Sequence, residues 1–148
     1  MTTPEENLKI VQDFFEVMMN GTPWAENPSV SKDIECYYSL SKDSIFCGKV
    51  NGVEEMDRYL KVIFEKMNDS KFDSHYNNWV AYGNLVMCTA WERVFWRVEE
   101  GLVEHMVDYN MVFVITLDEN GLIVKFEELM QTALDGMFNI KIPPAPSS

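Results

Sequence analysis

Glu128 is the only acidic residue on one side of the last β-rich run of the chain. Strict alternation along this run puts it in a row with Leu122, Val124, Phe126 and Met130. A carboxyl group in such apolar surroundings has a raised pKa, which suits a general acid or a general base. The pattern favours a catalytic role for Glu128, although a structural ion pair with a buried cation explains it equally well.

Arg93 is the candidate for that cation. It lies in the middle of the run Leu85–Val98, where alternation places it on one side between Trp91 and Phe95. A charge in the middle of an aromatic row is costly unless it is paired. We therefore expect Arg93 and Glu128 to face the same apolar cavity, where Arg93 holds a substrate oxygen while Trp91 and Phe95 contact the substrate.

Three further residues are candidates for substrate contact: Tyr38, Tyr109 and Phe126. Tyrosine combines a large apolar ring with one hydrogen-bonding group, and core packing is the alternative for each of them. On the run 102–117, one face carries His105 and Tyr109 and the other carries Asp108 and Asn110, and the pattern leaves open which face looks inward.

Several classes of function do not fit the sequence. It has no glycine-rich phosphate-binding motif, no nucleophile elbow and no paired CxxC, and its two histidines do not suggest a metal centre. We expect no metal and no cofactor. A net charge of −12 argues against binding to nucleic acid or to a membrane surface. Three unpaired cysteines and a polar, acidic N-terminus predict a cytoplasmic protein.

The elements that position these residues follow from the periodicity. Helical spacing predicts helices over residues 4–19 and 53–67, and a helical turn over 131–138. Shorter strands are expected over 34–40 and 44–50, before four long strands over 72–82, 85–98, 102–117 and 122–130. Turn residues at hairpin spacing make these four an antiparallel meander. We predict an α+β fold in which a cone-shaped, curved antiparallel sheet wraps around helices, with one domain over residues 1–140 and a tail over 141–148.

The order of elements resembles the nuclear-transport-factor-two-like superfamily, and within it the SnoaL-like and limonene-epoxide-hydrolase-like proteins. The segments that carry the resemblance are KIVQDFFEVM, GVEEMDRYL, TAWERVFWRV and NGLIVKFEELM. In the epoxide hydrolases of this group, an Arg-x-Asp on the central strand, an Asp on the last strand and a Tyr-x-Asn pair surround a water. Here Arg93 matches the arginine, Phe95 stands at the central acid, Glu128 matches the last acid, and Cys36-Tyr37-Tyr38 is the nearest counterpart of Tyr-x-Asn.

The resemblance and the residues together predict a small cofactor-free enzyme. Its substrate is expected to be hydrophobic and oxygen-bearing, like a polyketide or a terpenoid, and its chemistry to be isomerisation, cyclisation, dehydration or epoxide opening. Glu128 would transfer the proton and Arg93 would orient an oxygen. The alternative is a non-catalytic ligand-binding or interaction module, because a fold does not fix a function. Apolar residues on both faces of the long strands predict a homodimer through the outer sheet face, with Trp96 as an anchor.

Overall fold

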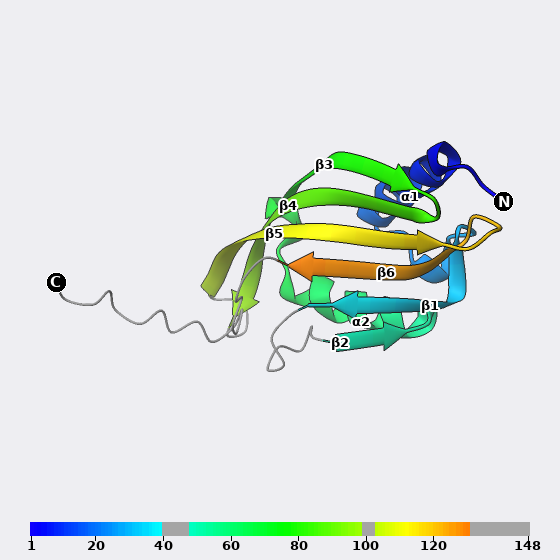
Figure 1. Cartoon of the computed structure of the whole chain (residues 1–148). Coiled ribbons are helices and arrows are strands. Elements are labelled where there is room, and N and C mark those ends of the chain that lie inside the picture. The colour runs from blue at the N-terminus through cyan, green and yellow to red at the C-terminus, as the bar shows by residue number, and fades with distance from the viewer. Residues whose placement is uncertain (40–47, 99–102, 131–148) are drawn as a thin grey trace.

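One curved six-stranded sheet carries two α-helices on a single face (Figure 1). The computed structural model describes residues 1–39, 48–98 and 103–130. The strands lie in the order β2-β1-β6-β5-β4-β3. The elements are α1 (Pro4–Met19), β1 (Val30–Tyr38), β2 (Gly48–Asn51), α2 (Val53–Lys66), β3 (Asp73–Tyr82), β4 (Leu85–Val98), β5 (Val103–Leu117) and β6 (Ile123–Met130), with single 3₁₀ turns η1 (Trp24–Glu26) and η2 (Asp69–Lys71).

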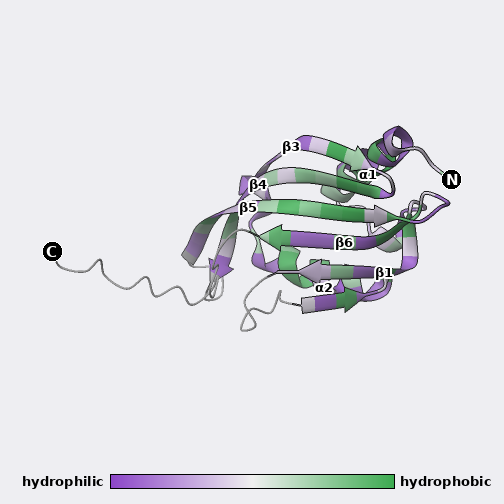
Figure 2. Ribbon diagram, in the orientation of Figure 1, coloured by the Kyte–Doolittle hydropathy of each residue, from purple (hydrophilic) through white to green (hydrophobic). Residues whose placement is uncertain are grey.

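The meander of four long strands is confirmed. Strands β3 to β6 pair antiparallel with their neighbours, and hydrophobic residues run almost without interruption along the second half of β5 (Figure 2). The Gly83-Asn84 turn joins β3 to β4, and Gly83 adopts a φ of +56°, which glycine reaches without strain. The sheet is mixed, because β1 pairs parallel with β6 on the other side. The predicted α+β cone is therefore the observed fold.

Helix α1 fills one half of the concave side. A capping box between Thr3 and Glu6 begins it, and Val11, Phe14 and Phe15 face the sheet and are buried. The two phenylalanine rings belong to an aromatic core, which we define as Phe14, Phe15, Trp24, Phe113 and Phe126. Neighbouring rings of this core pack mostly edge to face with centroids 5.0–6.2 Å apart.

Helix α2 contacts the sheet closely only near its beginning. Val53 and Met56 are buried, whereas Leu60 and Ile63 are half-buried and Phe64 is 45% exposed. The periodicity correctly predicted the helix and its inner face. The later turns of that face border a cavity instead of packing directly on the strands.

A register shift in β6 changes one predicted row. Pairing with β5 jumps between Lys125 and Ile123, so that both Ile123 and Phe126 point into the core. The expectation that Leu122 and Val124 share the inner face with Glu128 is wrong, because the bulge reverses the alternation before Phe126. Glu128 itself is on the inner side, as predicted.

Some predictions fall on other parts of the chain. The expected helical turn at 131–138, the tail at 141–148 and the start of the strand expected at 44–50 lie outside the described residues. The single-domain boundary at residue 140 stays a prediction. None of the helices within the described residues is both long enough and apolar enough to cross a bilayer.

Candidate active site

A cavity of about 520 Å³ lies between α2 and the concave side of the sheet, beside the end of α1. Its apolar wall includes Met18, Leu60, Ile63, Val94 and Met130. Eight residues with polar side-chain groups also line it: Asn20, Tyr38, Tyr59, Asp69, Glu92, Trp96, Tyr109 and Glu128; of the three acids, Asp69 on η2 is exposed at the surface. The sequence pattern predicted this hollow and the presence of Glu128 in it, but not its second carboxylate.

Glu128 is held in the centre of the sheet by β6. It lies opposite Tyr38 on β1 and opposite Phe113 on β5, and the residue is only 9% exposed. Burial raises the pKa of its carboxyl well above the ordinary value of 4.5, and the negative charge of Glu92 raises it further. Within the described residues, no side chain forms a hydrogen bond or an ion pair with this carboxyl.

Glu92 is the second carboxylate of the cavity. It lies on β4, opposite Ser74 on β3 and Tyr109 on β5. The hydroxyl of Tyr76 donates a hydrogen bond of 2.7 Å to Glu92 Oε1. Burial raises the pKa of Glu92, and the hydrogen bond from Tyr76 opposes that rise by stabilising the ionised form. The two acids of the cavity thus have different surroundings.

The prediction that Arg93 pairs with Glu128 is wrong. Arg93 lies on the outer face of the sheet, where its Nε and Nη2 donate hydrogen bonds of 2.8 and 3.0 Å to the two carboxylate oxygens of Asp108. Its guanidinium carbon is also 5.3 Å from the centre of the Trp91 ring. Asp108 lies directly opposite Arg93 on β5. The positive charge of Arg93 is therefore paired on the outer face, and no partner inside the cavity is required.

Three other residues predicted to contact substrate are not part of the cavity wall. Trp91 stacks on the His75 ring at 5.4 Å, and Phe95 lies beneath the ammonium group of Lys71 at 5.2 Å. Both alternate with the inward residues of β4 and so lie on the outer face. Phe126 is inside the molecule but belongs to the aromatic core.

Tyr38 and Tyr109 do line the cavity, as predicted. The hydroxyl of Tyr38 donates to the Met56 sulfur at 3.3 Å, and Tyr109 accepts a hydrogen bond of 2.7 Å from the Trp96 indole. Burial raises the pKa of both phenols, so they remain protonated near neutral pH. Trp96 was expected on the outer face, but it is 4% exposed and faces the cavity.

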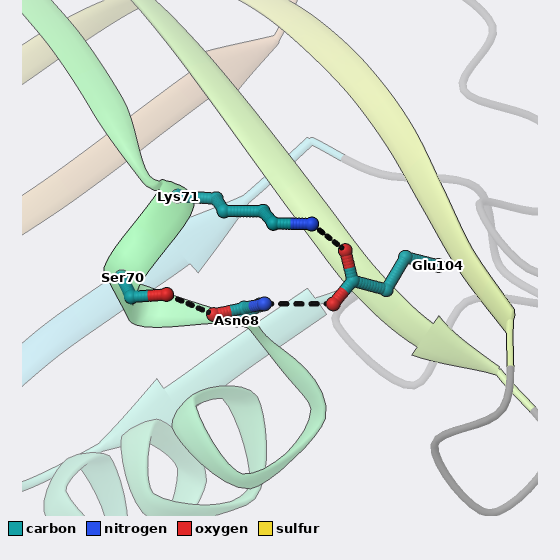
Figure 3. Close-up of polar contacts among 4 residues, drawn as sticks. All are labelled: Asn68, Ser70, Lys71 and Glu104. Carbon is teal, nitrogen blue, oxygen red and sulfur yellow. Dashed lines mark hydrogen bonds and ion pairs between the residues drawn. The ribbon is translucent and has the colours of Figure 1, made fainter.

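A polar cluster joins η2 and the residue before it to β5 (Figure 3). Asn68 Nδ2 and Lys71 Nζ donate to the two carboxylate oxygens of Glu104 at 2.7 and 2.8 Å, and Ser70 donates to Asn68 Oδ1. The two donors lower the pKa of Glu104. This cluster holds in place the segment that follows α2, including Met67, whose side chain lines the cavity.

Glu92, Tyr59 and Tyr76 were not predicted as site residues from the sequence. A usable signal existed in the β4–β5 hairpin: pairing the two runs so that Arg93 meets Asp108 also turns Glu92 and Tyr109 inward together. Tyr59 lies on α2 one turn after Met56, in the part of the helix that borders the cavity.

The cavity has acids and hydroxyl or indole donors but no basic residue among its described lining. Two carboxyl groups in unlike environments can divide the work of acid and base, one protonated and the other ionised. Within the described ranges, no group of three or more His, Cys, Asp or Glu side chains is placed to hold a metal ion.

Comparison with known proteins identifies the fold. No family model matches the chain, and no curated protein matches it either. A solved NTF2-like protein from Burkholderia xenovorans has a TM-score of 0.70 and 21% identity, covering 89% of this chain and 94% of its own. A putative SnoaL-like polyketide cyclase from Shewanella denitrificans has a TM-score of 0.68 and 14% identity, covering 84% and 90%.

A third similar structure is the epoxide hydrolase/cyclase-like enzyme SalBIII, which is associated with pyran ring formation in the polyether salinomycin. It has a TM-score of 0.68 and 15% identity, covering 89% of this chain and 95% of its own. These similarities span nearly the whole chain in both directions. They confirm the predicted nuclear-transport-factor-two-like fold.

Proposed function

We propose that this chain of NTF2-like fold is a cofactor-free enzyme that performs acid–base chemistry on a hydrophobic, oxygen-bearing substrate. The observation that carries the proposal is the pair of carboxyl groups, Glu92 and Glu128, in one largely apolar cavity. Buried carboxyl groups with raised pKa values are concentrated at catalytic sites because they can hold and release protons near neutral pH.

Glu128 is the general acid in this proposal. Its carboxyl is buried and lies near another negative charge, and both raise its pKa, which favours the protonated form. It would donate this proton to a substrate oxygen, such as a carbonyl or an epoxide oxygen. Tyr38 lies beside it on β1 and would help to orient that oxygen.

Glu92 is the general base. The hydrogen bond from Tyr76 favours its ionised form, which can accept a proton. In an epoxide opening, Glu92 would take the proton of an attacking water or internal hydroxyl while Glu128 protonates the epoxide oxygen. One proton leaves the nucleophile and one reaches the leaving oxygen, so the charges balance. In an isomerisation, Glu92 would remove a proton from carbon instead.

The similar structures support this range of reactions. A protein described as a putative SnoaL-like polyketide cyclase and an epoxide hydrolase/cyclase-like enzyme both have the same fold. A cavity of about 520 Å³ with inward-facing carboxyl groups also supports an enzyme over a purely structural domain. A non-catalytic binding protein is the competing outcome, and the following experiment distinguishes the two.

The experiment screens wild-type protein against hydrophobic epoxides, including limonene 1,2-epoxide and styrene oxide, and against enolisable ketones. We expect Glu128→Gln and Glu92→Gln each to lower turnover by about 10²- to 10⁴-fold while the folded spectrum is retained. The matched control is Glu127→Gln, whose carboxylate lies on the outer face beside Lys125 at 3.4 Å. Full activity in both cavity variants would overturn the catalytic assignment.

We also propose that the chain forms a homodimer through the outer face of the sheet. This face exposes apolar side chains from three strands: Val80 on β3 is 52% exposed, Met106 and Val112 on β5 are 54% and 37% exposed, and Leu129 on β6 is 37% exposed. The anchor is no longer Trp96, which points inward. Light scattering should give twice the 17.2 kDa chain mass, and Val112→Lys should reduce it to one chain. A monomeric wild-type protein would contradict the proposal.

A cytoplasmic location stays a prediction from the sequence.

A further inference from the structure

We propose that the natural ligand of the cavity is an apolar molecule that bears one positively charged nitrogen, bound between Glu92 and Glu128. This inference deepens the proposed function, because it names a class for the substrate of the same site. It stands on the charge and the aromatic lining of the cavity.

The first step is the balance of charge inside the cavity. Both carboxyl groups are remote from any basic side chain of the described lining, and the nearest cation on β4, Arg93, is committed to Asp108 on the other face. When one of the two acids is ionised, the cavity holds a negative charge that no part of the described protein neutralises. A ligand with one positive charge supplies the missing partner, whereas an anionic ligand would add a second uncompensated charge.

The second step is the state of the Glu128 side chain. It is buried to nine-tenths and lines the hollow, yet no described group bonds to its carboxyl. Buried polar groups in folded proteins are normally hydrogen-bonded, and an exception requires an explanation. A ligand group that interacts favourably with a carboxylate is such an explanation.

The third step is the aromatic lining. Tyr38 and Tyr59 from one side, Trp96 and Tyr109 from the other, and Phe72 at the rim all border the hollow. The faces of such rings attract organic cations, and cages of aromatic residues are used by proteins to bind alkylated ammonium groups. Aromatic rings also bury the apolar part of the ligand, so the two requirements of the ligand are met by the same residues.

The experiment compares three probes of similar size by calorimetry in the same solvent mixture. Benzyltrimethylammonium carries a permanent positive charge, neopentylbenzene is its neutral isostere, and phenylacetate is an anion. We expect benzyltrimethylammonium to bind at least about tenfold more tightly than neopentylbenzene, and phenylacetate to bind more weakly than both. Equal or tighter binding of the neutral isostere, or a preference for the anion, would overturn the proposal.

Three variants test whether the preference for the cationic probe arises from the two carboxyl groups of the cavity. Glu128→Gln and Glu92→Gln should each reduce the ratio of the two affinities, whereas Glu127→Gln, on the outer face, should leave it unchanged. An equal reduction in all three variants would point to a general effect of net charge and would overturn the placement in the cavity. If both cavity variants retain the full preference for the cation, the placement of the ligand between Glu92 and Glu128 is also overturned.

A pH series adds a readout that packing alone does not change. The charge of benzyltrimethylammonium is independent of pH, so any change in affinity comes from the protein. The titratable groups around Glu128 are Cys36 and Tyr38 from β1, Tyr59 from α2, Tyr76 from β3, Glu92 from β4 and Tyr109 from β5. Of these, the two carboxyl groups ionise below the thiol and phenol range. Asp69 on η2 is a further acid on the cavity wall, so the comparison with Glu128→Gln is needed to assign the change in affinity. Affinity should therefore increase with pH in the wild type and increase less in Glu128→Gln; a pH-independent wild type would contradict the proposal.

The binding result and the catalytic result can fail separately. If Glu128→Gln abolishes turnover but the protein does not prefer the cation, the proposed function survives and the ligand class is wrong. If the cation preference depends on both acids but neither is needed for turnover of any substrate, the ligand class survives and the catalytic roles are wrong.

Discussion

The two halves of the concave side differ in how the sheet is covered. In one half, α1 places Phe14 and Phe15 against Phe113 and Phe126, and the space is filled by edge-to-face rings. In the other half, α2 borders a hollow of about 520 Å³ that contains two carboxyl groups. The first arrangement maximises buried apolar contact. The second leaves space unfilled and leaves the Glu128 carboxyl without a hydrogen-bond partner among the described residues, and both features reduce stability. The comparison indicates that stability comes mainly from the filled half, whereas the hollow half holds the groups to which we assign the proposed chemistry.

The largest effect is expected in the filled half, for Phe15→Ala. This ring is 4% exposed and lies 5.1–5.5 Å from the ring centres of Tyr76, Trp79 and Phe113. Its removal leaves a void among rigid rings, and the free energy of unfolding should fall by about 3–5 kcal/mol. Urea unfolding followed by circular dichroism measures this. A loss below about 1 kcal/mol would mean that the filled half is not the main source of stability.

The next effect concerns the unpaired acid of the hollow half. Because burial raises the pKa of Glu128 above its ordinary value of 4.5, the folded protein retains a proton that the unfolded chain has lost. Stability should therefore fall as the pH rises from about 4.5 toward the raised pKa, by at most about 1.4 kcal/mol per pH unit for this one proton.

Glu128→Gln cannot ionise and should flatten this dependence, becoming more stable than the wild type on the alkaline side. Glu92, whose pKa is also raised, would account for the slope that remains. Glu127→Gln serves as the control and should keep the wild-type slope. Thermal unfolding across a pH series provides the measurement; identical slopes in all three proteins would show that Glu128 does not carry an unfavourable buried charge.

The smallest effect is expected for Leu60→Ala on α2. Leu60 is half-buried and already borders the hollow, so shortening it enlarges an existing space instead of creating a new one. The free energy of unfolding should fall by about 1–2 kcal/mol, clearly less than for Phe15→Ala. Ligand affinity should change more noticeably, because the side chain is part of the wall. A loss as large as that of Phe15→Ala would remove the distinction between the two halves.

The same contrast explains which parts of the molecule could be predicted from the sequence. The meander was predictable because turn residues such as Gly83-Asn84 interrupt long β-rich runs, and α1 was predictable from its capping residues and apolar spacing. The bulge near Ile123 was not, because a register shift leaves no compositional mark.

The inward face of β4 was also not predictable from alternation. Apolar and aromatic residues occupy both of its faces, with Phe95 outside and Trp96 inside, so the period of two gives no contrast there. Glu92 and Arg93 are adjacent residues of opposite charge. Because a buried charge must be paired, the sequence favoured Arg93 as the inward-facing partner of Glu128, whereas Glu92 is the residue that faces the cavity. The partner of Arg93 was supplied by the adjacent strand, and only the hairpin register reveals that.

The parallel pairing of β1 with β6 has a consequence for the synthesis of the protein. It joins the first strand of the chain to the last described one, and the hydrogen bond from the Met130 amide to Ser39 Oγ closes a separation of 91 residues. A nascent chain on the ribosome that has not yet released β6 has no Glu128 and leaves the facing edges of β1 and β5 open to other strands. The pocket can therefore close only after β6 has joined the sheet, and until then those two open edges can pair with strands of neighbouring chains.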